Sequence, residues 1–341
     1  MITMKSRPDL YRDAIVVDMT APGSPLAVMT PDEQSTDEWY AAYEQAGCTF
    51  ISCTVAADHV AYTPEAALTE IAKARHWLLA RPDRFLLVET ADDIFRAKRE
   101  GKVGIVLNFQ GTLQYQRDLR LVEAFKRLGV HHSLLTYNQK NLVGDGCHER
   151  TDAGLSSYGI ALIQEMNRVG VLVDITHAGY RTAMEAIEVS SAPVIMSHCS
   201  PRAIFDHQRN VPDDQIVAMA KTGGVIGIHG VGIFMSADGS DISPQRLFEF
   251  LDHTVQLVGP DHVGFGLDYI MHTANARKAV VGKTGESYKR DSGYHNDEYF
   301  FAPPSIMRDV ADVMLSNGYS EGDVFNILGG NWVNIFRTIC G

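Results

Sequence analysis

Two histidines, His177 and His198, each stand at the end of a short apolar run whose composition is typical of a β-strand. The runs 171–176 and 193–197 are rich in β-branched and other apolar residues. Apolar residues recur at helical spacing over 180–190, so the stretch predicts one strand–helix–strand crossover. Neighbouring parallel strands present their carboxyl ends on the face where α/β barrels build active sites. Since neutral imidazole is a common zinc ligand, the pair indicates a metal or catalytic site.

Polar side chains also follow other runs of strand length. Gln110, Tyr137 and Asp268 each stand directly after such a run. Each alone has an ordinary explanation, as a loop amide, a rim aromatic or a helix N-cap, just as one histidine could be structural. Their shared position at strand ends predicts that they converge on one cavity. His229, which ends the run 225–228, is a further candidate for a ligand or a substrate contact.

The elements that must position these residues alternate between strands and helices, which is the pattern of a parallel α/β fold. Strands are predicted at 15–18, 49–55, 84–88, 103–110, 131–137, 171–177, 193–198, 225–229 and 262–268. Helices are predicted at 63–80, 91–100, 119–128, 158–168, 180–190, 213–221, 244–258, 305–317 and 321–328. We expect a (β/α)8 TIM-like barrel with one extra strand, forming a single domain over 1–341. An open doubly wound sheet is the alternative, but no GxGxxG motif follows the first strand.

The composition is typical of a globular protein, with 45% hydrophobic and 21% charged residues. A net charge of −12 argues against non-specific binding to nucleic acid or to anionic membranes. The amino-terminal residues contain no apolar signal-like core, and no run approaches the ~20 apolar residues that span a bilayer. We therefore expect a cytoplasmic protein. Its five cysteines form no CxxC pair and are predicted to be reduced thiols.

Several phrases of the sequence carry a resemblance to a known family. They are EMNRVGVLVDITH at 165–177, SSAPVIMSH at 190–198, RNVPDD at 209–214 and GGVIG at 223–227. The chain resembles the membrane (renal) dipeptidase family over nearly its whole length, through LGGNW at 328–332. The resemblance implies a barrel of the metal-dependent hydrolase type with two zinc ions. It also implies a homodimer that hydrolyses dipeptides and related small amides.

The resemblance assigns roles to four residues of this chain. His177 and His198 match the two histidines that hold the second zinc. Arg209 matches the arginine that contacts the substrate and its tetrahedral intermediate, a role that suits the preorganised donors of a guanidinium. Asp268 matches the acid that handles the proton of the attacking water and of the leaving amine.

Four positions depart from the family's pattern. Thr20 and Pro22 stand where the family has the His-x-Asp ligands of the first zinc. Gln110 replaces the bridging glutamate and has no charge to bridge two dications, and Tyr137 replaces a substrate-binding histidine. We therefore expect at most one zinc ion, held by the two histidines, with Asp268 or Tyr137 as a candidate third ligand.

Two predicted loops offer further groups. The loop 138–150 contains Cys147 and His148, either of which could be a ligand or a nucleophile, although a polar lid is the simpler interpretation. The segment 273–299 follows the last predicted strand and is long and irregular. We expect it to shape substrate access or to meet a second subunit.

Three functions are consistent with these residues. In the first, a hydrolase cleaves a dipeptide or another small amide, with Asp268 as the general base and Arg209 as the oxyanion stabiliser. In the second, Tyr137, Asp268 and Arg209 move a proton in an isomerase, epimerase or lyase, and Gln110 binds the substrate. The third is a binding protein with a residual pocket. We rank the three in this order, because a pure binding protein has no need of the retained set.

Overall fold

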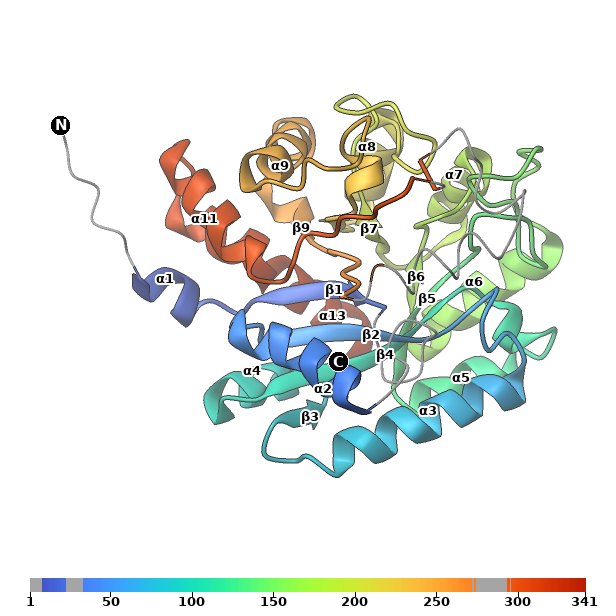
Figure 1. Cartoon of the computed structure of the whole chain (residues 1–341). Coiled ribbons are helices and arrows are strands. Elements are labelled where there is room, and N and C mark those ends of the chain that lie inside the picture. The colour runs from blue at the N-terminus through green and yellow to red at the C-terminus, as the bar shows by residue number, and fades with distance from the viewer. Residues whose placement is uncertain (1–7, 23–32, 272, 274–292, 295) are drawn as a thin grey trace.

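The computed structural model describes residues 8–22, 33–271, 273, 293–294 and 296–341 (Figure 1). Its parallel strands are β1 Val17–Ala21, β2 Phe50–Ala57, β3 Phe85–Leu87, β4 Val103–Gln110, β5 Val130–Leu134, β6 Leu172–Asp174, β7 Val194–Cys199, β8 Ile226–Ile228 and β9 Val263–Phe265. They are ordered β1-β2-β4-β5-β6-β7-β8-β9, and β3 pairs with β4 off this path. All nine predicted strands are confirmed, and β3 is the extra one.

Helices follow most strands and pack on the outside of the sheet (Figure 1). They are α1 Pro8–Asp13, α2 Glu33–Gln45, α3 Pro64–Leu79, α4 Ala91–Glu100, α5 Arg120–Arg127, α6 Ser157–Val169, α7 Tyr180–Val189, α8 Asp213–Lys221, α9 Pro244–Val258, α11 Ile306–Ser316, α12 Glu321–Phe325 and α13 Asn331–Cys340. Short 3₁₀ turns lie at Leu113–Tyr115, Gly232–Phe234 and Pro260–His262, and a π-helical turn at Asn326–Gly330. The predicted helices are confirmed, while α1, α2 and α13 were not predicted.

The eight strands of the main path form a nearly closed barrel. Two hydrogen bonds link the two ends of this path, β1 and the residues after β9. Leu267 N donates to Asp18 Oδ1 over 2.8 Å, and Asp268 N donates to Thr20 O over 3.1 Å. These bonds place Asp268 beside the carboxyl end of β1.

The strands are buried on both faces, as expected for a parallel sheet covered by helices. Every residue of β2 and of β4 is buried. Helix α13 packs against β9, and its Trp332 donates from Nε1 to Phe265 O over 3.1 Å. A Cβ added to Gly264 would lie 2.3 Å from that Nε1, so only glycine leaves room for the indole.

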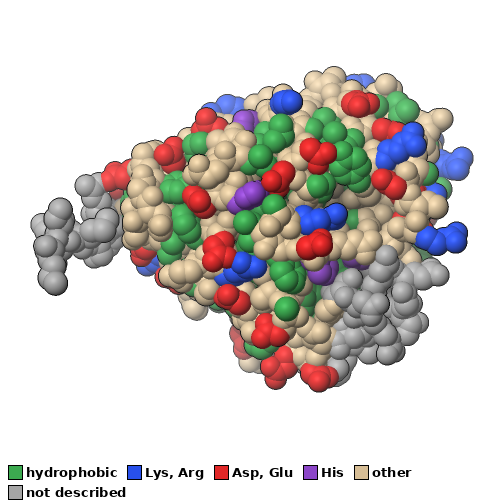
Figure 2. Space-filling view, turned by 90° about the horizontal axis from the view of Figure 1, so that it is seen from above, with side chains coloured by type: hydrophobic (Ala, Val, Ile, Leu, Met, Phe, Trp, Pro, Cys, Tyr) green, Lys and Arg blue, Asp and Glu red, His purple; other side chains and the backbone are tan. Residues whose placement is uncertain are grey.

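The state of the cysteines, the character of the described helices and the charges on one face bear on the predictions from composition. The five cysteines are all free thiols, as predicted. None of the described helices has both the length and the apolar character needed to cross a membrane. On the face shown in Figure 2, acidic and basic side chains are interspersed.

Candidate active site

His177 and His198 lie together at the carboxyl end of the barrel, as predicted. His198 belongs to β7 and His177 follows β6, and their Nε2 atoms are 3.1 Å apart. Both are buried, and burial lowers the pKa of each imidazole well below its usual range. The positive charge of Arg209 adds to this lowering of both pKa values. Both rings are therefore neutral near pH 7, the state that can bind a metal ion.

The hydrogen bonds around the two rings indicate where their protons lie. The amide oxygen of Asn138 can only accept, so His177 donates to it from Nδ1 over 2.6 Å and keeps a lone pair on Nε2. His198 then donates from its own Nε2, and its Nδ1 accepts from a hydroxyl. The candidates are Thr20 Oγ1 at 3.0 Å and Ser197 Oγ at 2.9 Å. The hydrogen-bond partners that orient the two imidazole rings, an amide and two hydroxyls, are thus uncharged.

Five described non-glycine residues have a positive φ, and three of them follow the strands that carry the candidate site. The φ angles are 48° at Asn138, 67° at His177 and 57° at Asp268. Residues with a Cβ rarely adopt this conformation, because the Cβ crowds the following carbonyl. Strained residues of this kind cluster at active sites, where the surrounding structure holds them. The strained loops after β5, β6 and β9 are consistent with the predicted active site at this end of the barrel.

Arg209 is a deeply buried cation, with 2% of its surface exposed. Its Nη2 donates to His198 O over 2.9 Å, and its Nη1 lies 3.7 Å from Cys199 Sγ. Within the described residues its Nε has no hydrogen-bond partner and no carboxylate pairs with its guanidinium. An unpaired buried charge is unfavourable, so this guanidinium is suited to receive an anionic group.

A cavity of about 230 Å³ lies beside this arginine. His177 and Arg209 are part of its wall, together with Cys147 from the loop after β5 and Tyr180 at the start of α7. The volume lies below the common range of ligand pockets, about 300–1,000 Å³, so the cavity suits a small substrate.

Asp268 is tied to the histidine pair through β1. Its N–H donates to Thr20 O over 3.1 Å, and the Thr20 hydroxyl lies 3.0 Å from His198 Nδ1. Burial raises the pKa of Asp268 to about 6, although the positive charge of Arg209 opposes the rise. A carboxyl that titrates near neutral pH is suited to general acid–base chemistry.

Of the predicted substrate contacts, Tyr137 joins the site and Gln110 is held elsewhere. The ring of Tyr137 stacks on that of His177, with centroids 4.2 Å apart, and lies 4.5 Å from the ring of His59. Gln110 ends β4, as predicted, but its Nε2 donates to Thr54 Oγ1 over 3.2 Å.

The remaining predicted candidates are engaged with other partners. His229 is fully buried and its Nε2 lies 3.0 Å from Asn210 Oδ1. His148 Nε2 lies 2.9 Å from Tyr294 OH. Burial raises the pKa of Cys147 to about 11, which keeps the thiol protonated and argues against its use as a nucleophile. The segment 273–299 lies mostly outside the described residues.

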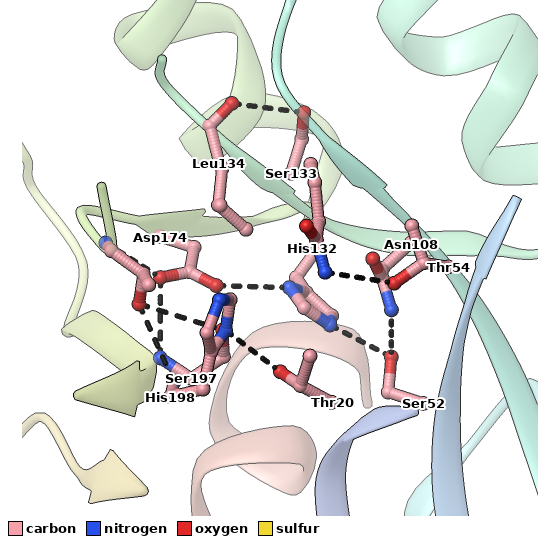
Figure 3. A network of polar contacts seen from close by, with 12 residues as sticks. Thr20, Ser52, Thr54, Asn108, His132, Ser133, Leu134, Asp174, Ser197 and His198 are labelled. Atoms are coloured by element: carbon pink, nitrogen blue, oxygen red, sulfur yellow. Dashed lines mark hydrogen bonds and ion pairs between the residues drawn. The ribbon is translucent and has the colours of Figure 1, made fainter. Parts of the chain in front are cut away.

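A polar network that was not predicted from the sequence lies inside the barrel (Figure 3). Asp174 Oδ1 accepts from Ser197 N over 3.2 Å, and Oδ2 lies 3.2 Å from His132 Nδ1. His132 Nε2 in turn lies 2.7 Å from Ser52 Oγ. The order serine, histidine, aspartate is that of a nucleophile relay, but all three side chains are fully buried. Because Ser197 also contacts His198, the network supports the histidine pair from below the cavity wall.

The available donors limit the metal site that these residues could form. The two Nε2 atoms are close enough to share one ion, since zinc lies about 2.0–2.1 Å from its nitrogen ligands. Across the described part of the chain, no three His, Cys, Asp or Glu side chains are grouped so as to hold a metal. That Asp268, Tyr137 or His229 supplies a third ligand stays a prediction.

Comparison with known proteins identifies the family. A model of the membrane dipeptidase family, peptidase family M19, matches residues 26–277. The chain belongs to this family. An uncharacterised dipeptidase of Schizosaccharomyces pombe is 33% identical over 241 residues, which are 66% of this chain and 58% of that protein. A dipeptidase of Claviceps purpurea is 28% identical over 259 residues, 75% of this chain and 56% of that protein. The M19 chain thus spans little more than half the length of these curated relatives.

Solved structures share the fold of this M19 protein. An amidohydrolase from Pseudomonas aeruginosa matches with a TM-score of 0.83 and 28% identity, covering 98% of this chain and 99% of its own. A metallopeptidase from Rhodobacter sphaeroides, bound to a phosphinate mimic of the dipeptide L-Ala-D-Ala, has a TM-score of 0.76 and 18% identity. It covers 96% of this chain and 100% of its own. These likenesses confirm the predicted TIM-like barrel of the metal-dependent hydrolase type.

Proposed function

We propose that this M19-family protein hydrolyses a small amide, such as a dipeptide or an N-acyl amino acid, at the cavity beside His177 and Arg209. The main support is the buried guanidinium of Arg209, whose Nε has no hydrogen-bond partner among the described residues. A substrate carboxylate or the oxyanion of a tetrahedral intermediate would supply the acceptor. The dipeptide mimic bound by the Rhodobacter structure and the dipeptidase names of the curated relatives support this substrate class.

The surroundings of Asp268 and Arg209 suit the chemical steps that we assign to them. Asp268 takes the proton of the attacking water and returns it to the leaving amine, because its raised pKa suits both steps. Arg209 binds the developing negative charge, and Tyr137, whose ring stacks on His177, contacts the substrate. Gln110, which already has a protein partner, has a supporting role in substrate binding. His229, which is buried against Asn210, is proposed for the same supporting role.

We further propose that the site holds at most one metal ion, on the Nε2 atoms of His177 and His198. Such an ion would lower the pKa of a bound water and polarise the amide carbonyl. It would require His198 to carry its proton on Nδ1, where the Thr20 hydroxyl can accept it. In the family resemblance Thr20, Pro22 and Gln110 stand where other ligands would be, which supports a reduced site.

The proposal is tested with metal-replete protein and a panel of dipeptides and N-acyl amino acids. We expect turnover of at least one member, and a fall of at least about 100-fold for Asp268→Asn. The exposed Asp312→Asn on α11 is the matched control and should behave like the wild type. No hydrolysis of any member by the wild type, at any metal loading, would contradict the proposed activity.

The metal part has its own readout, the metal content of protein purified without chelator. We expect no more than one ion per chain by elemental mass spectrometry, and its loss in both His177→Ala and His198→Ala. Two ions per chain would contradict a site for at most one metal ion, but would leave the proposed hydrolysis open to its own test.

The second candidate, a non-hydrolytic acid–base enzyme, is favoured by one observation. The two imidazoles already satisfy each other through neutral hydrogen bonds, and no third metal-binding side chain joins them within the described residues. Isotopes separate the two candidates. Incorporation of oxygen from ¹⁸O-labelled water into the product indicates hydrolysis, whereas solvent deuterium in a recovered substrate indicates proton transfer at carbon.

A further inference from the structure

The cavity of the proposed active site, of about 230 Å³, has two guanidinium groups in its wall, those of Arg202 and Arg209. Arg202 follows the end of β7 and is half-buried, and no step of the proposed hydrolysis uses it. An amide substrate with a free carboxyl group presents two negative charges during hydrolysis. They are the terminal carboxylate and the oxyanion that forms at the scissile carbonyl. Two cations in one cavity match these two charges.

The hydrogen bonds of Arg202 fix its guanidinium and leave one nitrogen unused. Nε donates to Asn210 O over 3.1 Å, and Nη2 donates to Asn210 O over 2.8 Å and to Gln208 O over 3.2 Å. These bonds use three of the five N–H groups of a guanidinium. The two N–H groups of Nη1 have no partner among the described residues, and Nη1 is not one of the polar atoms buried away from water. Arg202 therefore holds a pair of donors in a fixed orientation and open to a ligand.

The two carboxylates in the same wall, Glu149 and Asp152, are bound to main-chain N–H groups. The two oxygens of Glu149 accept from such groups over 2.8 and 3.1 Å. Those of Asp152 accept from Arg181 N over 2.9 and 3.1 Å. Within the described part of the chain, neither carboxylate forms an ion pair with Arg202. The charge of Arg202 is therefore available to an anionic group of the substrate.

We infer that Arg202 binds the terminal carboxylate of the substrate through Nη1, so that Arg209 is left to stabilise the oxyanion. The inference rests on the proposed function, because it assigns one end of the same substrate. In a dipeptide the terminal carboxylate lies one residue, about 3.5 Å, beyond the scissile carbonyl, so both groups fit in one small cavity. The bonds from Arg202 to Gln208 O and Asn210 O brace the residues on either side of Arg209. They thereby hold the two guanidiniums in a fixed relation, and the site selects amides that end in a free carboxylate.

Steady-state kinetics with a dipeptide that the wild type cleaves, and with the same dipeptide amidated at its carboxyl group, test the inference. Release of the amino-terminal amino acid is measured for both. We expect the wild type to favour the free acid at least about tenfold, mainly through KM. Arg202→Gln should raise KM for the acid at least about tenfold and leave KM for the amide within a few-fold, so that the preference is lost. Arg181→Gln is the matched control, because Arg181 lies on α7, pairs with Glu185 and does not line the cavity.

The comparison of acid and amide separates binding of the carboxylate from bracing of the loop that carries Arg209. An equal loss for the two substrates in Arg202→Gln would show a bracing role alone and would overturn the inference. A preference for the acid that survives in Arg202→Gln would also overturn it, because another group would then bind the carboxylate. If this variant fails to fold, the wild type decides, since equal KM values for the acid and the amide would contradict a carboxylate site.

Failure of the proposed hydrolysis is distinguishable from failure of this inference. If the wild type cleaves no dipeptide, the proposed hydrolysis fails, and calorimetric titration with alanyl-alanine and alanyl-alaninamide tests the inference alone. Tighter binding of alanyl-alanine, lost in Arg202→Gln, would support carboxylate binding by Arg202. Equal binding of the two compounds, or binding of neither, would overturn it.

Discussion

Arg209 influences every titratable group around it at the mouth of the barrel. Its charge lowers the pKa values of His177 and His198, and it opposes the rise in the pKa of Asp268. Both histidines are therefore neutral near pH 7. At the residue scale, burial sets the direction of each pKa shift in the site, and the charge of Arg209 is the second cause of each.

The pH profile of kcat/KM should report the carboxyl of Asp268. Burial raises its pKa above the ordinary value to about 6, so the base form is complete above about pH 7 and is lost as the pH falls through 6. We expect kcat/KM to decrease about tenfold per pH unit below that point. Removing Arg209, as in Arg209→Met, should move this limb to higher pH. A limb that stays in place in Arg209→Met would show that another group titrates.

Replacing Arg209 with lysine should separate charge from geometry. Arg209→Lys keeps a cation but loses the fork of donors that reaches His198 O and the cavity. We expect kcat/KM to fall by about 100-fold or more, the usual effect of removing an oxyanion donor. Arg246→Lys, which lies outside this cavity, serves as the control and should be nearly unaffected. A similar loss in both variants would indicate a general effect on folding.

At the scale of elements, closure of the barrel depends on Asp18 of β1. Its Oδ1 accepts from Leu267 N over 2.8 Å and from Thr20 N over 3.1 Å, and its Oδ2 accepts from Tyr43 OH of α2 over 3.0 Å. One carboxyl thus joins the first strand, the residues after the last strand and a helix. The same contacts position Thr20 against His198.

Substituting Asp18 should destabilise the barrel. Asp18→Ala leaves Leu267 N without its acceptor, and we expect the free energy of unfolding to fall by about 2–4 kcal/mol in urea denaturation. Asp18→Asn keeps an acceptor oxygen and should lose less. Equal losses in the two variants would argue that the carbonyl oxygen at this position is not what closes the barrel.

The pH dependence of stability adds a second readout for Asp18. Burial raises the pKa of its carboxyl in the folded state to about 7, above the ordinary value of an unfolded chain. Its contribution to stability is therefore greatest at low pH and is lost as the pH rises from about 4 to 7. The Asp18→Asn variant should lack this component of the slope.

At the scale of the whole molecule, the carboxyl end of the barrel carries the candidate site and the amino end is closed by packed apolar side chains. The carboxyl end carries the strained loops, the histidine pair and the cavity beside Arg209. The amino end is packed by α13, whose Trp332 belongs to a buried cluster with Val17, Phe50 and Phe336. The last residues of the chain therefore complete the core that the first strands begin.

Removing the indole of Trp332 should lower the stability of the whole domain. We expect Trp332→Ala to reduce the free energy of unfolding by about 3–5 kcal/mol, because it leaves a large cavity under β9. Trp332→Phe fills most of the space but loses the bond to Phe265 O, and should cost about 1 kcal/mol. Denaturant unfolding measures both. A small loss for the alanine variant would show that α13 is dispensable for the core.

The helices that were not predicted show where local patterns fail. Residues Thr36, Trp39, Tyr40 and Tyr43 of α2 form a buried stripe at helical spacing, but polar residues separate them in the sequence. Tyr40 of this stripe packs against Phe85 and Trp77, which lie in remote parts of the sequence. The burial of the helix therefore depends on tertiary contacts. Strand and helix types elsewhere were predictable, because β-branched runs and 3.6-residue periodicity are local properties.

The sequence by itself determined that His177 and His198 meet, because parallel strands joined by one crossover present their carboxyl ends side by side. It also indicated the positions of Arg209 and Asp268, through the family resemblance. Only the tertiary structure decided which atoms those groups contact. That Thr20 bonds His198, that no described carboxylate pairs with Arg209, and that the Asp268 pKa is near 6 depend on burial and on distances between remote segments, which no local pattern encodes.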